Sequence, residues 1–157
     1  MNYRNVLSIL GIALKAEGVL LLLPLLISIY CGEDCIQSFV ITALLTIFLG
    51  FIFSLKRNRE DNLTAKDGFI ICGLSWLILS LVGALPFYLS GYIPSYIDAV
   101  FETVSGFTTT GASILTDVEA LPKGLLFWRS FTHWIGGMGV LVFILAILPY
   151  LNQERCT

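Results

Sequence analysis

Charged side chains are scarce in this chain of 157 residues, since Asp, Glu, Lys and Arg together make up only 13% of it. A soluble domain carries about 25% charged residues. Hydrophobic residues make up 57% of the chain, and the mean hydropathy is +0.87. These values exclude an ordinary soluble domain and predict an all-α integral membrane protein. The formal net charge of −2 gives no indication of a nucleic-acid partner.

Histidine is nearly absent and cysteine is sparse, which limits the metal chemistry available to the chain. There is one histidine, His133, and there are four cysteines, Cys31, Cys35, Cys72 and Cys156. Their spacing matches no zinc-ligand pattern and no disulfide framework. We therefore expect free thiols, no structural metal and no organic cofactor.

Four apolar segments are long enough to cross a bilayer. They cover about residues 6–30, 36–55, 68–90 and 124–149. Lys15 and Glu17 interrupt the first, so we expect its helix to begin near Leu10, with the Lys15 side chain reaching towards the lipid headgroups. Gly83 and Pro86 are expected to break the third segment. No A-x-A-like cleavage site follows the first segment, which favours a retained helix over a signal peptide.

Lysine and arginine are concentrated on one side of these segments. The loop at 56–67 holds four of them, whereas the loop at 31–35 holds none and the 90–123 connection holds only Lys123. Arg4 lies near the N-terminus. Because cytoplasmic loops are enriched in basic residues, we expect a protein of the cell inner membrane with the 56–67 loop and both termini in the cytoplasm.

A short amphipathic helix is predicted at 95–106, between the third and fourth apolar segments. Ser95 and Asp98 fit a capping box at its start, and Gly106 is expected to end it. Apolar residues recur on one face of this helix, at Ile97, Val100, Phe101 and Val104. The helix is too short to cross a bilayer, so we expect a re-entrant half-helix.

The loop that follows, at 107–113, reads FTTTGAS. Irregular backbone at membrane depth survives only where it is buried in protein or lines a water-filled cavity. The threonines offer backbone carbonyls, Gly111 allows backbone angles that a side chain would forbid, and the end of the preceding helix carries partial negative charge. These features predict the selectivity filter of a cation pore. The alternative is an ordinary periplasmic loop.

The order of an apolar segment, FETVSGFTTTGAS and FWRSFTHWIGGMGVLVFILAILP resembles the first pore repeat of the Trk/Ktr/HKT potassium-uptake proteins, and most of all the TrkH-type bacterial membrane subunit. The resemblance implies four transmembrane helices, with a re-entrant half-helix and a selectivity-filter loop between the third and fourth. It implies potassium as the transported ion, bound through the carbonyls of Thr109, Thr110 and Gly111. Thr108 and Ala112 would flank these ion sites.

The expected partners are the lipid bilayer and the remaining pore repeats or other copies of the chain. A homodimer is left open, and the resemblance implies a cytoplasmic nucleotide-binding regulatory subunit. The chain divides into a two-helix lead-in at 1–67, a helix–pore loop–helix repeat at 68–151 and a tail at 152–157. Because the tail departs from the family pattern, we expect a truncated form or fragment that does not transport ions by itself.

Two features of the last apolar segment bear on the loop. Three closely spaced glycines leave one flank thin, so close packing behind the filter is expected; they are Gly136, Gly137 and Gly139. Arg129 is expected to reach the outer interface or, alternatively, to pair with Asp98 or Glu102.

Transport is the expected function, and we expect no enzyme activity. Two other function classes remain open. One is a non-conducting membrane protein that only packs against partner helices. The other is an intramembrane serine hydrolase that uses Ser113 and His133.

Overall fold

The computed structural model of the chain describes residues 3–55 and 65–153. Every regular element in these ranges is an α-helix, which confirms the predicted all-helical class. The helices are α1 (Tyr3–Leu20), α2 (Leu22–Cys31), α3 (Ile36–Ser54), α4 (Ala65–Gly83), α5 (Leu85–Leu89), α6 (Tyr96–Phe107) and α7 (Lys123–Gln153).

Three helical stretches in the described part of the chain are long and apolar enough to cross a membrane. They are Val6–Cys31 along α1 and α2, Ile36–Ser54 along α3, and Gly68–Leu89 along α4 and α5. They correspond to the first three predicted segments and support a multi-pass membrane protein. The fourth segment lies within α7, a continuous helix of 31 residues, and its crossing of the membrane stays a prediction.

The first helix begins earlier than the apolar pattern predicts. It starts at Tyr3, so the expected start near Leu10 is wrong. Val6, Leu10 and Leu14 are all buried, and α1 packs along α3. Tertiary packing of this face therefore extends the helix ahead of the purely apolar run.

Two proline-associated breaks divide the first and third spans. Pro24 has no N–H for the carbonyl of Leu20, and α1 gives way to α2 at Leu21. This break was not predicted. The predicted break near Gly83 and Pro86 is confirmed, because α4 ends at Gly83 and α5 carries the proline in its first turn.

The polarity of α3 is the reverse of that in a soluble protein. Ser38, Thr42 and Thr46 are buried, and each of the two threonine hydroxyls donates to the carbonyl four residues earlier, at 2.7 and 2.6 Å. Leu44 and Phe48 on the outer side are each 65% exposed. An apolar outer surface with satisfied polar groups inside suits a helix surrounded by lipid.

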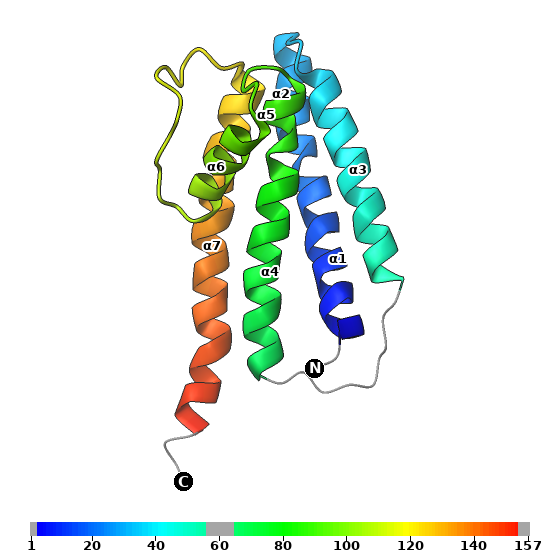
Figure 1. Cartoon of the computed structure of the whole chain (residues 1–157), viewed down its shortest axis with the longest axis vertical. Coiled ribbons are helices and arrows are strands. Elements are labelled where there is room, and N and C mark those ends of the chain that lie inside the picture. The colour runs from blue at the N-terminus through cyan, green and yellow to red at the C-terminus, as the bar shows by residue number, and fades with distance from the viewer. Residues whose placement is uncertain (1–2, 56–64, 154–157) are drawn as a thin grey trace.

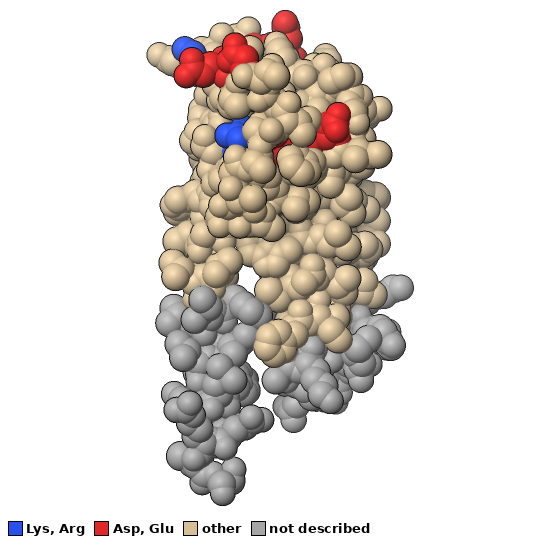
Figure 2. Space-filling model, turned by 60° about the vertical axis from the view of Figure 1, so that its left-hand side comes forward, with Lys and Arg blue, Asp and Glu red and all other residues tan. Residues whose placement is uncertain are grey.

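The helices form an upright bundle in which α1 contacts α3 and α4, while α6 contacts α4 and α7 (Figure 1). The start of α1, the end of α3, the start of α4 and the end of α7 lie at the same end of the bundle (Figure 1). α6 begins near the opposite end and descends only part of the way, and the connection after it climbs back to the start of α7 (Figure 1). Among the described residues, the charged side chains visible in Figure 2 lie in the part of the bundle towards that opposite end.

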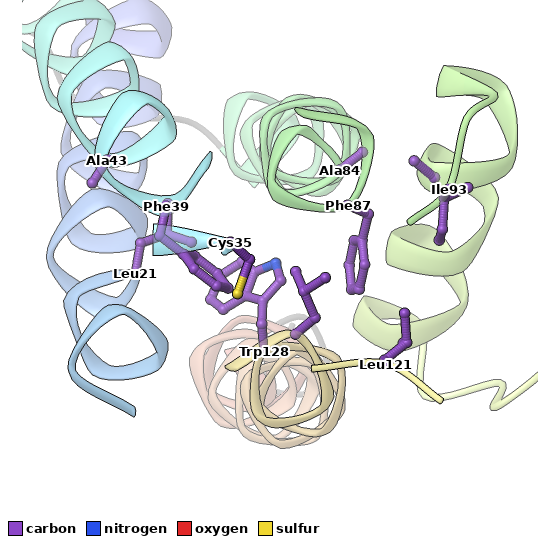
Figure 3. Close-up of a cluster of buried hydrophobic side chains, with 11 residues drawn as sticks. Leu21, Cys35, Phe39, Ala43, Ala84, Phe87, Ile93, Leu121 and Trp128 are labelled. Carbon is purple, nitrogen blue, oxygen red and sulfur yellow. The ribbon is translucent and has the colours of Figure 1, made fainter. Parts of the chain in front are cut away.

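A cluster of buried hydrophobic side chains lies in the half of the bundle that contains α6. Trp128 of α7 is fully buried and points between the helices towards Phe39, Phe87 and Cys35 (Figure 3). Its indole nitrogen donates a hydrogen bond to the carbonyl of Gly83 at 2.9 Å. Trp128 therefore fastens α7 to the point at which α4 ends.

Two sequence predictions fall wholly or partly on residues that the structure does not describe. Of the basic loop at 56–67, residues 56–64 lie outside the described ranges, and of the tail at 152–157, residues 154–157 do. The cytoplasmic placement of that loop and of the termini stays a prediction.

Candidate functional site

The start of α6 shows one of the two hydrogen bonds of the predicted capping box, and its end differs from the prediction. Ser95 is extended and its hydroxyl accepts a hydrogen bond from the N–H of Asp98 at 3.4 Å. The helix continues through Gly106 to Phe107, so the prediction that Gly106 ends it is wrong. A side chain at Gly106 would collide with the hydroxyl of Thr132 on α7. This glycine therefore serves close helix packing rather than termination.

In α6 the apolar face points away from the bundle and the polar face points into it, the reverse of a helix on the surface of a soluble protein. Ile97 is 78% exposed and Phe101 is 47% exposed, although both lie on the predicted apolar face. Glu102, Thr103 and Ser105 on the polar face are buried within the bundle. The apolar face of α6 is thus presented outwards, away from α4 and α7.

The loop after α6 turns sharply through two residues with left-handed backbone angles. Thr109 has a φ of 57° and Gly111 has a φ of 76°. Glycine adopts this region freely, whereas for threonine it is strained. Such strain is concentrated at functional sites, and the sequence indicated only the glycine.

The N–H groups of this turn point back to the end of α6. Those of Thr110 and Gly111 lie 3.0 and 3.4 Å from the carbonyl oxygen of Ser105, and that of Thr109 lies 2.9 Å from the carbonyl of Gly106. No residue that the structure describes donates a hydrogen bond to the carbonyls of Thr109, Thr110 or Gly111. Residues 108–112 are exposed. The loop therefore presents a short row of unused carbonyl acceptors.

A buried carboxylate anchors the returning part of the loop. Glu102 is 1% exposed, and its Oε1 accepts a hydrogen bond from the Nε of Arg129 on α7 at 2.5 Å. The hydroxyl of Ser113 lies 3.0 Å from each carboxylate oxygen, and the N–H of Ile114 lies 3.3 Å from Oε2. The Ser113 hydroxyl in turn accepts from the N–H of Leu115 at 3.1 Å. Helix, loop and α7 meet at this one carboxylate.

The pairing of Arg129 resolves an alternative that the sequence left open. Its partner is Glu102, whereas Asp98 is exposed in the first turn of α6. The sequence did not indicate that Ser113 and Ile114 share the same carboxylate, because they are eleven and twelve residues away from it. Only the return of the loop brings them together.

The three glycines of α7 have different surroundings. A side chain at Gly136 would collide with the backbone of Phe107, directly before the loop, and one at Gly139 would lie 2.9 Å from the ring of Trp76 on α4. A side chain at Gly137 would meet no described atom within 4 Å. Gly136 is thus the one that brings α7 against the base of the loop.

The N-terminal end of α7 has a second anchor that the sequence did not reveal. The two carboxylate oxygens of Glu33, in the loop between α2 and α3, accept from the N–H groups of Lys123 and Gly124 at 2.6 and 3.0 Å. A negative charge at a helix start is favourable. Burial raises the pKa of the neighbouring Cys35 thiol, which stays protonated and donates to Glu33 at 3.5 Å.

The residues proposed for a serine hydrolase are engaged with other partners. The Ser113 hydroxyl donates to Glu102, and the Nδ1 of His133 lies 2.9 Å from the carbonyl of Arg129. No group of three or more His, Cys, Asp or Glu side chains within the described residues is placed to hold a metal ion. Ser113 and His133 are thus hydrogen-bonded to Glu102 and Arg129 rather than to each other.

Comparison with known proteins places these features in a family. Residues 35–156 match TrkH, a family described as a cation transport protein. The chain is 42% identical to an uncharacterized cation transporter of Methanocaldococcus jannaschii, over 94% of the chain and 31% of the relative. It is 40% identical to the Trk system potassium uptake protein TrkH of Halomonas elongata, over 97% of the chain and 32% of the relative.

A solved structure agrees with the fold as well as with the sequence. The crystal structure of the potassium transporter TrkH from Vibrio parahaemolyticus superposes with a TM-score of 0.89 at 37% identity. The match covers 95% of this chain and 32% of that one. The chain therefore spans about a third of the length of the relatives that it matches.

Proposed function

Because the chain belongs to the TrkH family of cation transport proteins, we propose that it forms one part of a potassium pathway across a membrane. The observation that carries this proposal is the loop at the end of α6, which turns its N–H groups inwards and leaves the carbonyls of Thr109, Thr110 and Gly111 without donors among the described residues. In this proposal those carbonyls are the ion ligands, with Thr108 and Ala112 beside them.

The chemistry of the loop suits a dehydrated monovalent cation. Carbonyl oxygens can replace the water around such an ion, and the C-terminal end of α6 adds partial negative charge close to them. The hydroxyls of Thr108 and Thr110 lie 2.8 Å apart and bond to each other, while that of Thr108 also bonds to the carbonyl of Val104 at 2.7 Å. The backbone carbonyls are thus the better ligands.

One loop approaches an ion from one side only, so the pathway needs further protein around it. The remaining pore repeats, or other copies of the chain, would complete the ring of carbonyls and cover the exposed apolar face of α6. The relative from Halomonas elongata is named as part of a Trk system. We propose an inner-membrane assembly with cytoplasmic termini, a homodimer as one form of it, and a cytoplasmic nucleotide-binding subunit as its regulator.

A chimera tests this function directly. The chain replaces the matching segment of the Vibrio parahaemolyticus transporter in a bacterial strain that lacks potassium uptake. We expect growth at low potassium, and we expect Gly111→Asp to abolish it, since a carboxylate side chain and a restricted φ disrupt the carbonyl row. Gly137→Ala, in an open position, is the matched control. Growth of the Gly111→Asp chimera at equal membrane abundance contradicts the proposed filter.

The second candidate function is that of a fragment that packs with partner helices without conducting ions. Measuring potassium uptake by the chain expressed alone distinguishes it from a pore formed by several copies. The exposure of residues 108–112 favours this candidate for the isolated chain, because nothing in the described structure encloses an ion there. We expect no restored uptake from the chain alone. Growth at low potassium that is lost on Gly111→Asp would show that several copies assemble into a pore.

A further inference from the structure

The two limbs of the loop are held in different ways. The first limb, residues 108–111, hydrogen-bonds to backbone carbonyls at the end of α6. The second limb, residues 112–115, is held by side chains, since the Ser105 hydroxyl donates to the carbonyl of Ala112 at 2.5 Å and Glu102 accepts from Ser113 and Ile114. Side-chain substitution can therefore loosen the second limb while the first keeps its backbone bonds.

The carboxylate of Glu102 has three hydrogen-bond donors, at least one on each oxygen. Oε1 accepts from Arg129, Oε2 accepts from the N–H of Ile114, and the single hydroxyl hydrogen of Ser113 lies within reach of both oxygens, at 3.0 Å from each. Charge-assisted bonds of this kind are stronger and more directional than neutral ones. Since Glu102 is 1% exposed and the side chain of Arg129 is 17% exposed, few water molecules are available to substitute for a lost donor.

We infer that Glu102 and Ser113 are positioning residues that fix the second limb and thereby set the preference of the filter for potassium over sodium, with Arg129 holding the carboxylate in place. The inference rests on the proposed function. Ser113 lies two residues after Gly111, so a shift of Ser113 moves the Gly111 carbonyl. Selectivity depends on the number and placement of coordinating carbonyls, and a loosened limb changes both.

Three substitutions separate the hydrogen bonds that position the loop from the charge of the Glu102 carboxylate. Ser113→Ala removes the hydroxyl between Glu102 and Leu115 but leaves the ion pair with Arg129 intact, so the helices remain fastened. Ser113→Thr retains the hydroxyl. Glu102→Gln retains one acceptor oxygen, loses the charge, and leaves Arg129 without a counter-ion. These three variants separate a loop-positioning role from a general contribution to folding.

The test measures potassium and sodium uptake by the chimera described above, with KM and the maximal rate obtained separately for each ion. We expect the potassium preference to fall about tenfold in Glu102→Gln and a few-fold in Ser113→Ala, as loss of one or two buried hydrogen bonds implies. The change should appear in the ratio of the two KM values at unchanged membrane abundance. Ser113→Thr should retain the parental ratio.

The controls separate failure of this inference from failure of the proposed function. If Gly111→Ser changes the ion preference while Ser113→Ala and Glu102→Gln do not, the filter assignment stands and the positioning role is wrong. If uptake by the Gly111→Asp chimera also stays normal, the proposed function itself is wrong. Should Glu102→Gln fail to accumulate, Ser113→Ala alone decides, because an unchanged ion preference in that variant contradicts the inference.

Discussion

Two glutamates in this chain are equally buried and differ in almost everything else. Glu102 in α6 is 1% exposed and Glu17 in α1 is 3% exposed. Glu102 accepts hydrogen bonds from Arg129, Ser113 and Ile114, whereas neither carboxylate oxygen of Glu17 has a partner among the described residues.

The surroundings of Glu17 explain the difference between the two regions. An added side chain at Gly83 would lie 2.8 Å from Glu17 Oε1, 3.1 Å from a methyl group of Thr103 and 3.3 Å from the ring of Phe107. Glu17 therefore lies near Gly83 of α4 together with Thr103 and Phe107 of α6, among a methyl group and an aromatic ring rather than hydrogen-bond donors. Burial of a carboxylate is favourable only where donors accompany it, so the two sites should respond to substitution in opposite directions.

The largest expected effect is the loss of the cation beside Glu102. Arg129→Leu leaves that carboxylate buried without a counter-ion and should lower the free energy of unfolding by about 3–5 kcal/mol. Thermal unfolding of the chain in detergent, followed by circular dichroism, measures the change. Lys123→Ala is the matched control, because its exposed side chain lies outside the pair. An unchanged Tm in Arg129→Leu would remove the distinction between the two glutamates.

The opposite response is predicted at the other glutamate. Glu17→Leu replaces an unpartnered buried carboxylate by an apolar side chain of similar size, and should raise the free energy of unfolding by about 1–4 kcal/mol. Glu102→Leu is the paired measurement and should lower it, since Arg129 then lacks its partner. If both substitutions destabilise the chain to the same extent, Glu17 has a partner that makes it equivalent to Glu102.

The next largest effect on stability is expected from the close packing of α6 against α7, the two helices that carry Glu102 and Arg129. Gly106→Ala forces a methyl group against Thr132 and should cost about 1–3 kcal/mol through overpacking. Gly137→Ala adds the same group where no described atom lies within 4 Å, and should leave the Tm unchanged or raise it. Equal Tm values for the two variants would show that α6 and α7 are not tightly packed at this level.

The smallest expected effect concerns the N-terminal end of α7, the helix that carries Arg129. Glu33→Ala removes the acceptor of the Lys123 and Gly124 N–H groups and should cost about 0.5–2 kcal/mol, as the loss of a helix cap does. Asp34→Ala, at an exposed neighbouring position, is the control. A Tm shift in Asp34→Ala as large as that in Glu33→Ala would attribute the effect to general loop charge rather than to capping.

Local patterns in the sequence predicted most of the elements. Long apolar runs indicated the spans, because a helix in lipid needs about 20 apolar residues, and Pro86 indicated the break after Gly83 because it lacks an N–H. Ser95 indicated the start of α6 through its side-chain cap, and Gly111 indicated a turn through its freedom at positive φ. Each of these effects acts within a few residues of the chain.

Contacts between distant residues decided what local patterns could not. The sequence predicted a helix end at Gly106, since glycine often follows the last residue of a helix. Its actual role in packing depends on Thr132, which is far away in the sequence. Thr109 has a positive φ in the turn whose N–H groups bond back to the end of α6.

The difference between Glu17 and Glu102 arises in the same way. Both residues lie in helices rich in apolar residues, so the sequence alone marks each as a charged residue in a largely apolar setting. Which one has donors depends on where the loop and α7 return, and the free energy of a buried charge is set by those neighbours rather than by its own residue type. The sequence by itself determined where the apolar spans and the start of α6 lie, because those signals act locally. The tertiary structure decided how far α1 extends and which of the buried charges are paired.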